Sequence, residues 1–255
     1  MIRNCLLAAA ATAMLCAGAA AAPVPATVKA ALSDAARPEA DTKRDADRKP
    51  AAMLSFAGIR PGLRVMDLIP GGGYFTRIFA KAVGPNGYVY AFQPTELDHF
   101  FKDKQPPIVA VAAAYPNVSV IHAPVNTLVA PESLDVVWTS QNYHDLKDDF
   151  FKPADTDLVN KAIYNALKPG GLYIVLDHSA EKGSGVRDTD TLHRIDEAVV
   201  KKEVEAAGFK LIGESQVQRN PKDSRTVKVF DPSIRGHTDQ FILKFRRPLR
   251  AGGRS

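Results

Sequence analysis

The sequence predicts an α/β fold built on a mostly parallel sheet. A short apolar run at residues 64–69 ends in Pro70-Gly71-Gly72-Gly73, and a helical apolar stripe over residues 75–83 follows directly. Further strand-length apolar runs alternate with helical periodicity along the chain. This alternation implies parallel strands joined by right-handed crossovers, and a length of 255 residues suits one such domain.

The chain begins with a segment that is typical of a secretory signal peptide, residues 1–22. Arg3 provides a positive charge, residues 6–15 are apolar, and residues 17–22 are small. Both cysteines lie in this segment, so the mature chain would contain no thiolate nucleophile, disulfide or cysteine-ligated zinc. We therefore expect an exported protein, periplasmic or secreted, that has no membrane contact once the leader is removed.

The remaining chain divides into a polar N-terminal tether, residues 23–49, which could also be a frayed helix, and a single domain, residues 50–250. A helix over residues 50–58 opens the domain, with proline at its first position and glycine at its end. The net charge of +5 is spread among alternating signs without a lysine or arginine block. This pattern argues against nucleic acid as a partner and indicates an ordinary solvated surface, while the oligomeric state stays open.

Six further strands and two further helices follow the first strand–helix unit. The strands are expected at residues 88–92, 117–121, 134–139, 172–176, 209–217 and 240–246. The helices are expected over residues 155–167 and 195–207. The polar connection at residues 218–239 is too long for a simple turn, and it predicts a lid, a binding loop or an extended hairpin.

The glycine loop is the best candidate for a ligand site. A strand that leads through glycines into a helix aims free N–H groups and the positive end of the helix dipole at whatever lies above the loop. Glycine is needed there because a ligand can touch the backbone only where no Cβ intervenes. The dinucleotide fingerprint G-x-G-x-x-G matches at only one glycine, so NAD or FAD is a weak interpretation.

The loop resembles motif I of the class I S-adenosylmethionine-dependent methyltransferases. That motif places an acidic residue in the first strand before G-x-G-x-G, and here Asp67, Gly71 and Gly73 match while Ile69 replaces the first glycine. Ala-Leu-Lys-Pro-Gly-Gly at residues 166–171 is a second landmark of this family. The form Pro-Gly-Gly-Gly-Tyr resembles a group of exported methyltransferase-like bacterial proteins.

The resemblance implies a fold, a cofactor and a set of site residues. The fold is a doubly wound, mostly parallel seven-stranded sheet, Rossmann-like, with a C-terminal antiparallel strand pair, and the cofactor is S-adenosylmethionine. Gln93 stands where the family usually has an acidic ribose ligand, which predicts weaker binding or a different ribose contact. The candidate cofactor-binding residues are Asp67, Gly71, Gly72, Gly73, Tyr74, Gln93 and Asn142.

The candidate catalytic residues are His144 and Asp177. Methyl transfer from a sulfonium needs mainly alignment, with a base only where the acceptor must lose a proton. His144 is the best base available because its ordinary pKa is near neutral, and Asp177 or Asp145 could orient it. The alternative is an ordinary loop histidine with a structural hydrogen bond.

No metal site is predicted. Asp177-His178 could combine with Asp145 as oxygen and nitrogen ligands, but no spacing motif supports this arrangement. Residues 193–197 stand at the start of the late helix, where the acidic side chains are explained by the helix dipole.

Two hypotheses follow for the function. The first is a methyltransferase that uses S-adenosylmethionine and acts on an unidentified small acceptor. The alternative is an exported non-catalytic small-ligand-binding protein that retains the fold, for which Ile69 and Gln93 are the expected departures. An oxidoreductase ranks third.

Overall fold

The computed structural model describes residues 24–249 apart from residues 103 and 153, and within them a seven-stranded sheet forms the centre of the domain. The strand order is β3-β2-β1-β4-β5-β7-β6. Strands β1 to β5 pair in parallel, and β7 pairs antiparallel with both β5 and β6. The strands are β1 (Arg64–Leu68), β2 (Tyr88–Pro94), β3 (Val118–Ala123), β4 (Leu134–Ser140), β5 (Leu167–His178), β6 (Lys210–Ser215) and β7 (Gln240–Arg246).

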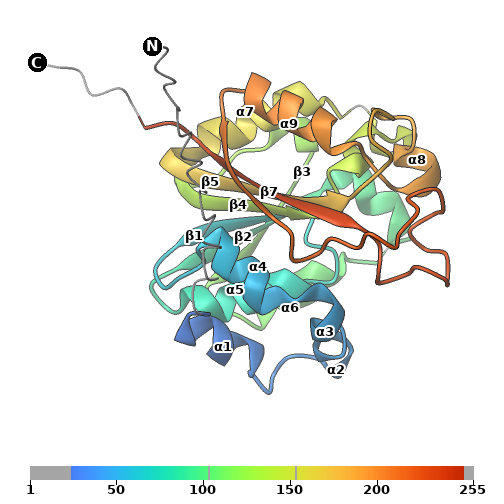
Figure 1. The fold of residues 1–255 in the computed structure, drawn as a ribbon. Helices are drawn as coiled ribbons and strands as arrows, with labels where there is room; N and C mark the ends of the chain where they lie inside the picture. Colours follow the sequence, from blue (N-terminus) through green and yellow to red (C-terminus); the bar gives the residue numbers. More distant parts are fainter. Residues whose placement is uncertain (1–23, 103, 153, 250–255) are drawn as a thin grey trace, which may run out of the picture.

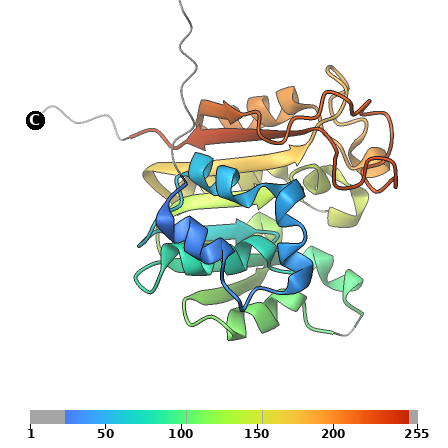
Figure 2. The same ribbon diagram turned by 60° about the horizontal axis from the view of Figure 1, so that its bottom comes forward.

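Helices cover both faces of the sheet (Figures 1 and 2). The α-helices are α1 (Ala26–Leu32), α2 (Glu39–Thr42), α3 (Asp45–Arg48), α4 (Pro50–Ala57), α5 (Tyr74–Val83), α6 (Pro107–Ala113), α7 (Thr156–Ala166), α8 (Thr189–Leu192) and α9 (Glu197–Ala206). Helices α1, α4, α5 and α6 pack on one face around a core that includes Phe79 and Trp138. Helices α7 and α9 pack on the other face around Tyr173 and Phe209.

The predicted fold class is confirmed, and the predicted strands and long helices are found at nearly the expected positions. Helix α5 begins directly after the glycine loop and ends at Gly84, as its apolar stripe indicated. The side chain of Asp155 accepts the N–H groups of Asp157 and Leu158 and so caps α7. Residues 168–171 do not form a separate turn before β5, because the strand already pairs at Leu167 and bulges through them.

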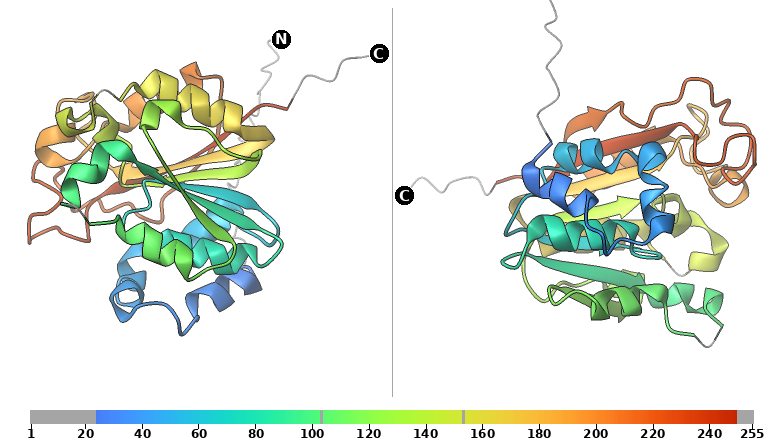
Figure 3. Two further views of the ribbon diagram at one scale, coloured as in Figure 1. Left: turned by 180° about the vertical axis from the view of Figure 1, so that it is seen from behind. Right: turned by 90° about the horizontal axis from the view of Figure 1, so that it is seen from below.

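The segment expected as a polar tether is folded against the domain. Residues 26–48 form α1, α2 and α3. Val28 and Ala31 on one face of α1 are fully buried in the core beside α5, because they recur at helical spacing. The segment then continues to the end of the sheet where the β1–α5 loop lies, so it helps to form the site (Figure 3). The expected leader, residues 1–22, lies outside the described residues.

Residues 216–239 connect β6 to β7 without regular secondary structure and cross the same end of the sheet (Figure 1). A buried ion pair fixes this connection, because Arg194 Nη1 lies 2.8 Å from Asp223 Oδ2 and both side chains are inaccessible to solvent. Among the described residues, no helix has the length and apolar character that crossing a bilayer requires.

Candidate functional site

The site lies at the carboxyl ends of β1 and β4, where the strand order reverses. Ligands of open α/β sheets bind at this switch point because the loops diverge there and leave a crevice. A cavity of about 410 Å³ lies beside the glycine loop and is lined by Asp67, Gly71 and Gly72, among others. A second cavity of about 420 Å³ adjoins it, with Arg48, Gln141 and Phe230 in both walls.

The three glycines of the loop have different roles. Gly71 has a positive φ of 55°, and a Cβ built on either Gly71 or Gly72 would meet no atom within 4 Å. Both glycines line the first cavity, so a ligand can reach their backbone. Gly73 instead faces helix α6, because an added Cβ would lie 2.9 Å from Val111 Cγ2. Gly73 therefore allows α5 to pack closely on α6 and does not line the cavity.

Strained backbone gathers around the first cavity. Ile69, Gln141 and His193 all have positive φ, at 59°, 64° and 52°, although none is glycine. All three residues line the cavity. A positive φ is costly for side chains with a Cβ, and most costly for a β-branched residue such as isoleucine. Ile69 thus occupies the conformation for which the resembled motif uses glycine.

Asp67 and Asn142 connect β1, the glycine loop and β4. The Thr76 hydroxyl donates a hydrogen bond of 2.6 Å to Asp67 Oδ2, which links the carboxylate to the first turn of α5. Burial raises the pKa of Asp67 to about 7, and the hydrogen bond from Thr76 opposes this shift. The Asn142 amide donates to the carbonyl groups of Ile69 and Ser140 at 3.0 and 2.8 Å, which holds the ends of β1 and β4 together.

Arginines from the N-terminal helices form a cationic wall of the cavity. The Arg48 guanidinium lies 4.6 Å from the centre of the Tyr74 ring and donates a 2.8 Å hydrogen bond to Gln141 Oε1. Arg44 also lies over Tyr74, at 5.6 Å. Burial lowers the pKa of Arg48 to about 10, and repulsion from Arg44 adds to this effect. Tyr74 itself donates its hydroxyl hydrogen to Asp45 Oδ1 at 2.6 Å.

Gln93 does not reach either cavity at the switch point. Its side chain is buried at the end of β2, and its amide donates only a long 3.4 Å contact to the Pro94 carbonyl. Gln93 is absent from the residues that line the two cavities. The expected ribose contact would therefore require Gln93 or its surroundings to move.

His144 and Asp177 form a buried hydrogen-bonded pair. His144 Nδ1 lies 2.8 Å from Asp177 Oδ1, and the backbone N–H of His144 donates to Asp177 Oδ2 at 2.8 Å. Because a carboxylate only accepts hydrogen bonds, Nδ1 carries the proton and Nε2 is left facing the cavity side. Residues 144–147 form a 3₁₀-helix instead of an extended segment. Asp145 therefore turns back, with Oδ1 3.1 Å from His144 Nε2.

Burial and the neighbouring carboxylates have opposite effects on the pKa of His144. Burial disfavours its charged form, but the carboxylates of Asp177 and Asp145 outweigh this effect and raise the pKa of His144 well above its ordinary value. Burial also opposes ionisation of Asp145, yet hydrogen bonds from His144 and His193 lower the pKa of this carboxyl. Burial lowers the pKa of the neighbouring His178 well below its ordinary value.

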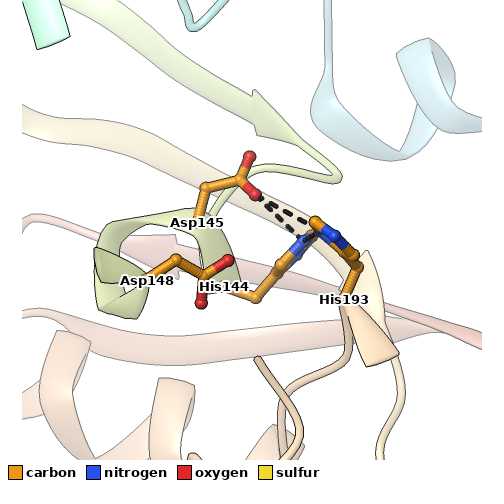
Figure 4. Close-up of side chains that lie close together, drawn as sticks. All are labelled: His144, Asp145, Asp148 and His193. Carbon is orange, nitrogen blue, oxygen red and sulfur yellow. Dashed lines mark hydrogen bonds and ion pairs between the residues drawn. The ribbon is translucent and has the colours of Figure 1, made fainter. Parts of the chain in front are cut away.

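His193 and Asp148 complete a cluster of four potential metal ligands with His144 and Asp145. One ligand atom from each residue lies within 4.8 Å of the others (Figure 4). His193 Nδ1 lies 3.3 Å from His144 Nε2 and 3.8 Å from Asp145 Oδ1. Asp148 is 1% exposed, and burial raises its pKa to about 6. Asp177 and His178, considered above as metal ligands, are outside this group.

Sequence reasoning did not identify Arg44, Arg48, Asp148 or His193. His193 was explained by its place at the start of the late helix, whereas the structure places it in the cavity wall, 49 residues from His144. No local pattern indicates that contact. The spacing of Val28 and Ala31 in the N-terminal segment, by contrast, was a usable sign that this segment packs on the domain.

Comparison with known proteins finds related methyltransferases. The chain is similar to "Ubiquinone/menaquinone biosynthesis C-methyltransferase UbiE" of Saccharophagus degradans, with 24% identity over 193 residues that cover 75% of this chain and 67% of the relative. The protein of the same name from Shewanella oneidensis is 26% identical over 192 residues, covering 75% and 66%. The chain thus spans about two thirds of the length of these curated relatives. No family model matches the chain.

Solved structures share the fold. A methyltransferase from Mesorhizobium loti, described as S-adenosylmethionine dependent, has a TM-score of 0.56 at 16% identity and covers 80% of this chain and 100% of its own. The [4+2]-cyclase SpnF has a TM-score of 0.57 at 18% identity, covering 80% and 81%. At these identities the neighbours establish the Rossmann-like methyltransferase fold. In sequence and in fold the chain is thus similar to S-adenosylmethionine-dependent methyltransferases.

Proposed function

We propose that this protein is an S-adenosylmethionine-dependent methyltransferase that acts on a small acceptor. The observation that carries the proposal is the cavity beside the bare backbone of Gly71 and Gly72 at the switch point of the sheet. The sequence relatives are named as methyltransferases, which favours an enzyme over a non-catalytic binding protein. Because SpnF is named as a cyclase on the same fold, the fold alone does not decide the chemistry.

The lining of the first cavity suits the amino-acid end of S-adenosylmethionine. Its volume of about 410 Å³ falls in the usual range for small-molecule sites. Asp67 offers a carboxylate to the ammonium group, and Arg48 offers a guanidinium to the carboxylate. The open space above Gly71 and Gly72 leaves their N–H groups and carbonyls accessible to the ligand. The residues present therefore fit this cofactor at its methionine end.

The adjoining cavity is the proposed place of the acceptor. When bound, S-adenosylmethionine would supply a methyl group on a sulfonium for in-line displacement by the acceptor, with S-adenosylhomocysteine as the leaving group. Phe75 and Phe230 contribute apolar surface to the walls of this region. For an acceptor that must lose a proton and that reaches into the first cavity, which His144 lines, we assign His144 with a deprotonated Nε2 as the base and Asp177 as the group that holds its Nδ1–H.

We also propose that the protein is exported from the cytosol. The signal-peptide pattern of residues 1–22 indicates export to the periplasm or beyond. Methyl transfer at that location requires the cofactor to be supplied outside the cytosol. A small-molecule acceptor without nucleic acid stays our prediction, because the charged residues form no basic block.

Calorimetric titration of the protein without residues 1–22 tests this function. We expect S-adenosylmethionine and S-adenosylhomocysteine to bind with micromolar affinity. Gly71→Val should weaken binding by at least about tenfold, or about 1.4 kcal/mol, because the new side chain enters the cavity.

Gly62→Val is the matched control. Gly62 also has a positive φ, 82°, and open space around an added Cβ, but it lies in the turn before β1, away from the cavity. The two variants therefore share the backbone strain and differ only in the cavity. No heat at millimolar cofactor, or equal affinities of the two variants, would refute the proposal.

A further inference from the structure

Two imidazole nitrogens and one carboxylate oxygen lie close together in the wall of the first cavity. His144 Nε2, Asp145 Oδ1 and His193 Nδ1 lie 3.1, 3.3 and 3.8 Å apart in pairs. A tetrahedral zinc ion with bonds of about 2.0 Å separates its ligand atoms by about 3.3 Å, and an octahedral ion with slightly longer bonds separates adjacent ligands by about 3.0 Å. The separations of 3.1 and 3.3 Å match the spacing of ligands around one transition-metal ion, and the 3.8 Å separation of Asp145 Oδ1 from His193 Nδ1 is somewhat wider.

His144 Nδ1 donates a hydrogen bond to a carboxylate, as is usual in metal-binding histidines. A ligating histidine usually donates its other ring N–H to a carboxylate, which fixes the tautomer and raises the basicity of the ligating nitrogen. Asp177, which is fully buried, accepts this N–H and the backbone N–H of His144. A metal ion that displaces the Nε2 proton would meet the Nε2 lone pair at the same point as Asp145 Oδ1 and His193 Nδ1.

Asp148 is a second, independent observation that points to a ligand at this place. Its side chain is buried, and neither carboxylate oxygen has a partner at full hydrogen-bond distance among the described residues, although the Thr189 side chain is a nearby, weaker donor. Buried carboxylates are normally paired or bound to a metal, because an isolated buried charge is costly. The nearest lysine in sequence, Lys147, is directed away and pairs with Glu203 at 2.5 Å. Asp148 is also within 4.8 Å of the other three ligand atoms.

We propose that His144, Asp145, Asp148 and His193 bind a divalent transition-metal ion such as zinc (Figure 4). Two imidazoles favour such an ion over magnesium or calcium, which prefer oxygen ligands alone. Three of the four residues line the first cavity, so the ion keeps a face open to a small molecule. The positive φ of His193 is the strained conformation that places its ring in the cluster.

The metal site rests on its own residues and does not depend on the proposed methyl transfer. If both proposals hold, His144 Nε2 binds the ion and is not free to act as a base. The ion would then lower the pKa of a bound acceptor in its place. Metal binding is measured without S-adenosylmethionine. Failure of one proposal is therefore separable from failure of the other.

Titration of chelator-treated and dialysed protein with zinc chloride, followed by calorimetry, tests the site. We expect one zinc ion per chain with micromolar or tighter affinity. Asp148→Asn and His193→Asn should each weaken binding by at least about tenfold. Both changes are mild for folding, since the first keeps the side-chain shape and the second keeps a residue that tolerates positive φ.

His122→Ala is the control for adventitious zinc binding. His122 Nε2 lies 2.8 Å from Asp98 Oδ1, so it is a histidine–aspartate pair, but its side chain is 44% exposed and stands apart from the cluster. We expect this variant to bind zinc like the wild type. The proposal is overturned by the absence of saturable binding at 100-fold excess zinc, or by cluster variants that bind as tightly as the control.

Discussion

At the residue scale, Asp67 makes the stability of the protein depend on pH in an unusual direction. Burial raises the pKa of Asp67 to about 7 from an ordinary value of 3.8. Between these pH values the folded state therefore binds more protons than the unfolded state, and this group makes the protein less stable as the pH rises. The difference corresponds to an effect on the order of 4 kcal/mol.

We predict that Asp67→Asn removes this loss of stability at higher pH. Relative to the wild type, the free energy of unfolding of the variant should increase as the pH is raised from about 4 to 7, because asparagine stays neutral throughout. Urea denaturation at several pH values measures the difference. A stability difference that is constant with pH would contradict the assignment.

Asp231→Asn provides a control of opposite sign. The Ser233 hydroxyl and backbone N–H bind Asp231 and lower the pKa of its carboxyl. Its contribution to stability is present above the unfolded pKa and is lost as the pH falls through the folded pKa. The Asp231→Asn variant should therefore lose stability relative to the wild type as the pH rises.

At the element scale, α1 is the part of the structure that the sequence interpretation described least well. In a flexible tether, shortening the Val28 side chain would not change the stability of the protein. The structure instead buries this side chain completely. We predict that Val28→Ala lowers the free energy of unfolding by about 2 kcal/mol, from lost burial and the cavity left behind. Thermal or urea denaturation measures this change.

Val129→Ala removes the same atoms from a side chain that is 67% exposed and should leave stability nearly unchanged. Equal stabilities of the Val28 and Val129 variants would mean that α1 does not pack on the domain in solution. The comparison matters for function because the chain after α1 carries Arg44 and Arg48 to the cavity.

The short 3₁₀-helix at residues 144–147 shows how a local conformation decides a site. In an extended segment, Asp145 would point away from His144, since neighbouring side chains alternate. The helical turn instead brings both side chains to the same cluster. Short polar segments after a strand carry little periodicity, so their conformation was not predictable from the sequence.

At the scale of the whole molecule, export is the prediction with the broadest consequences. We expect the chain isolated from cells to be in the periplasmic or secreted fraction, with a mass that lacks about the first 22 residues. Cell fractionation followed by mass spectrometry measures both properties. A full-length chain in the cytosol would refute export, and it would remove the need for an external supply of the cofactor.

The sequence by itself determined the order of the strands, the helices α4, α5, α7 and α9, the position of the glycine loop and the fold class, but not the short helices α1, α2, α3, α6 and α8. These features depend on local periodicity and on glycine and proline, which act within a few residues. Asp67, Gly71, Gly72 and Asn142 were also predicted to be at the site, and the structure places them along the cavity.

Only the tertiary structure decided which of these residues meet. It turned Gly73 toward α6, left Gln93 away from the cavities, and brought Arg48 and His193 from distant segments to the strand ends. It also paired Asp177 with His144 across 33 residues of sequence. Such contacts depend on how helices and loops pack over the sheet, and packing between distant segments leaves no periodic trace in the chain.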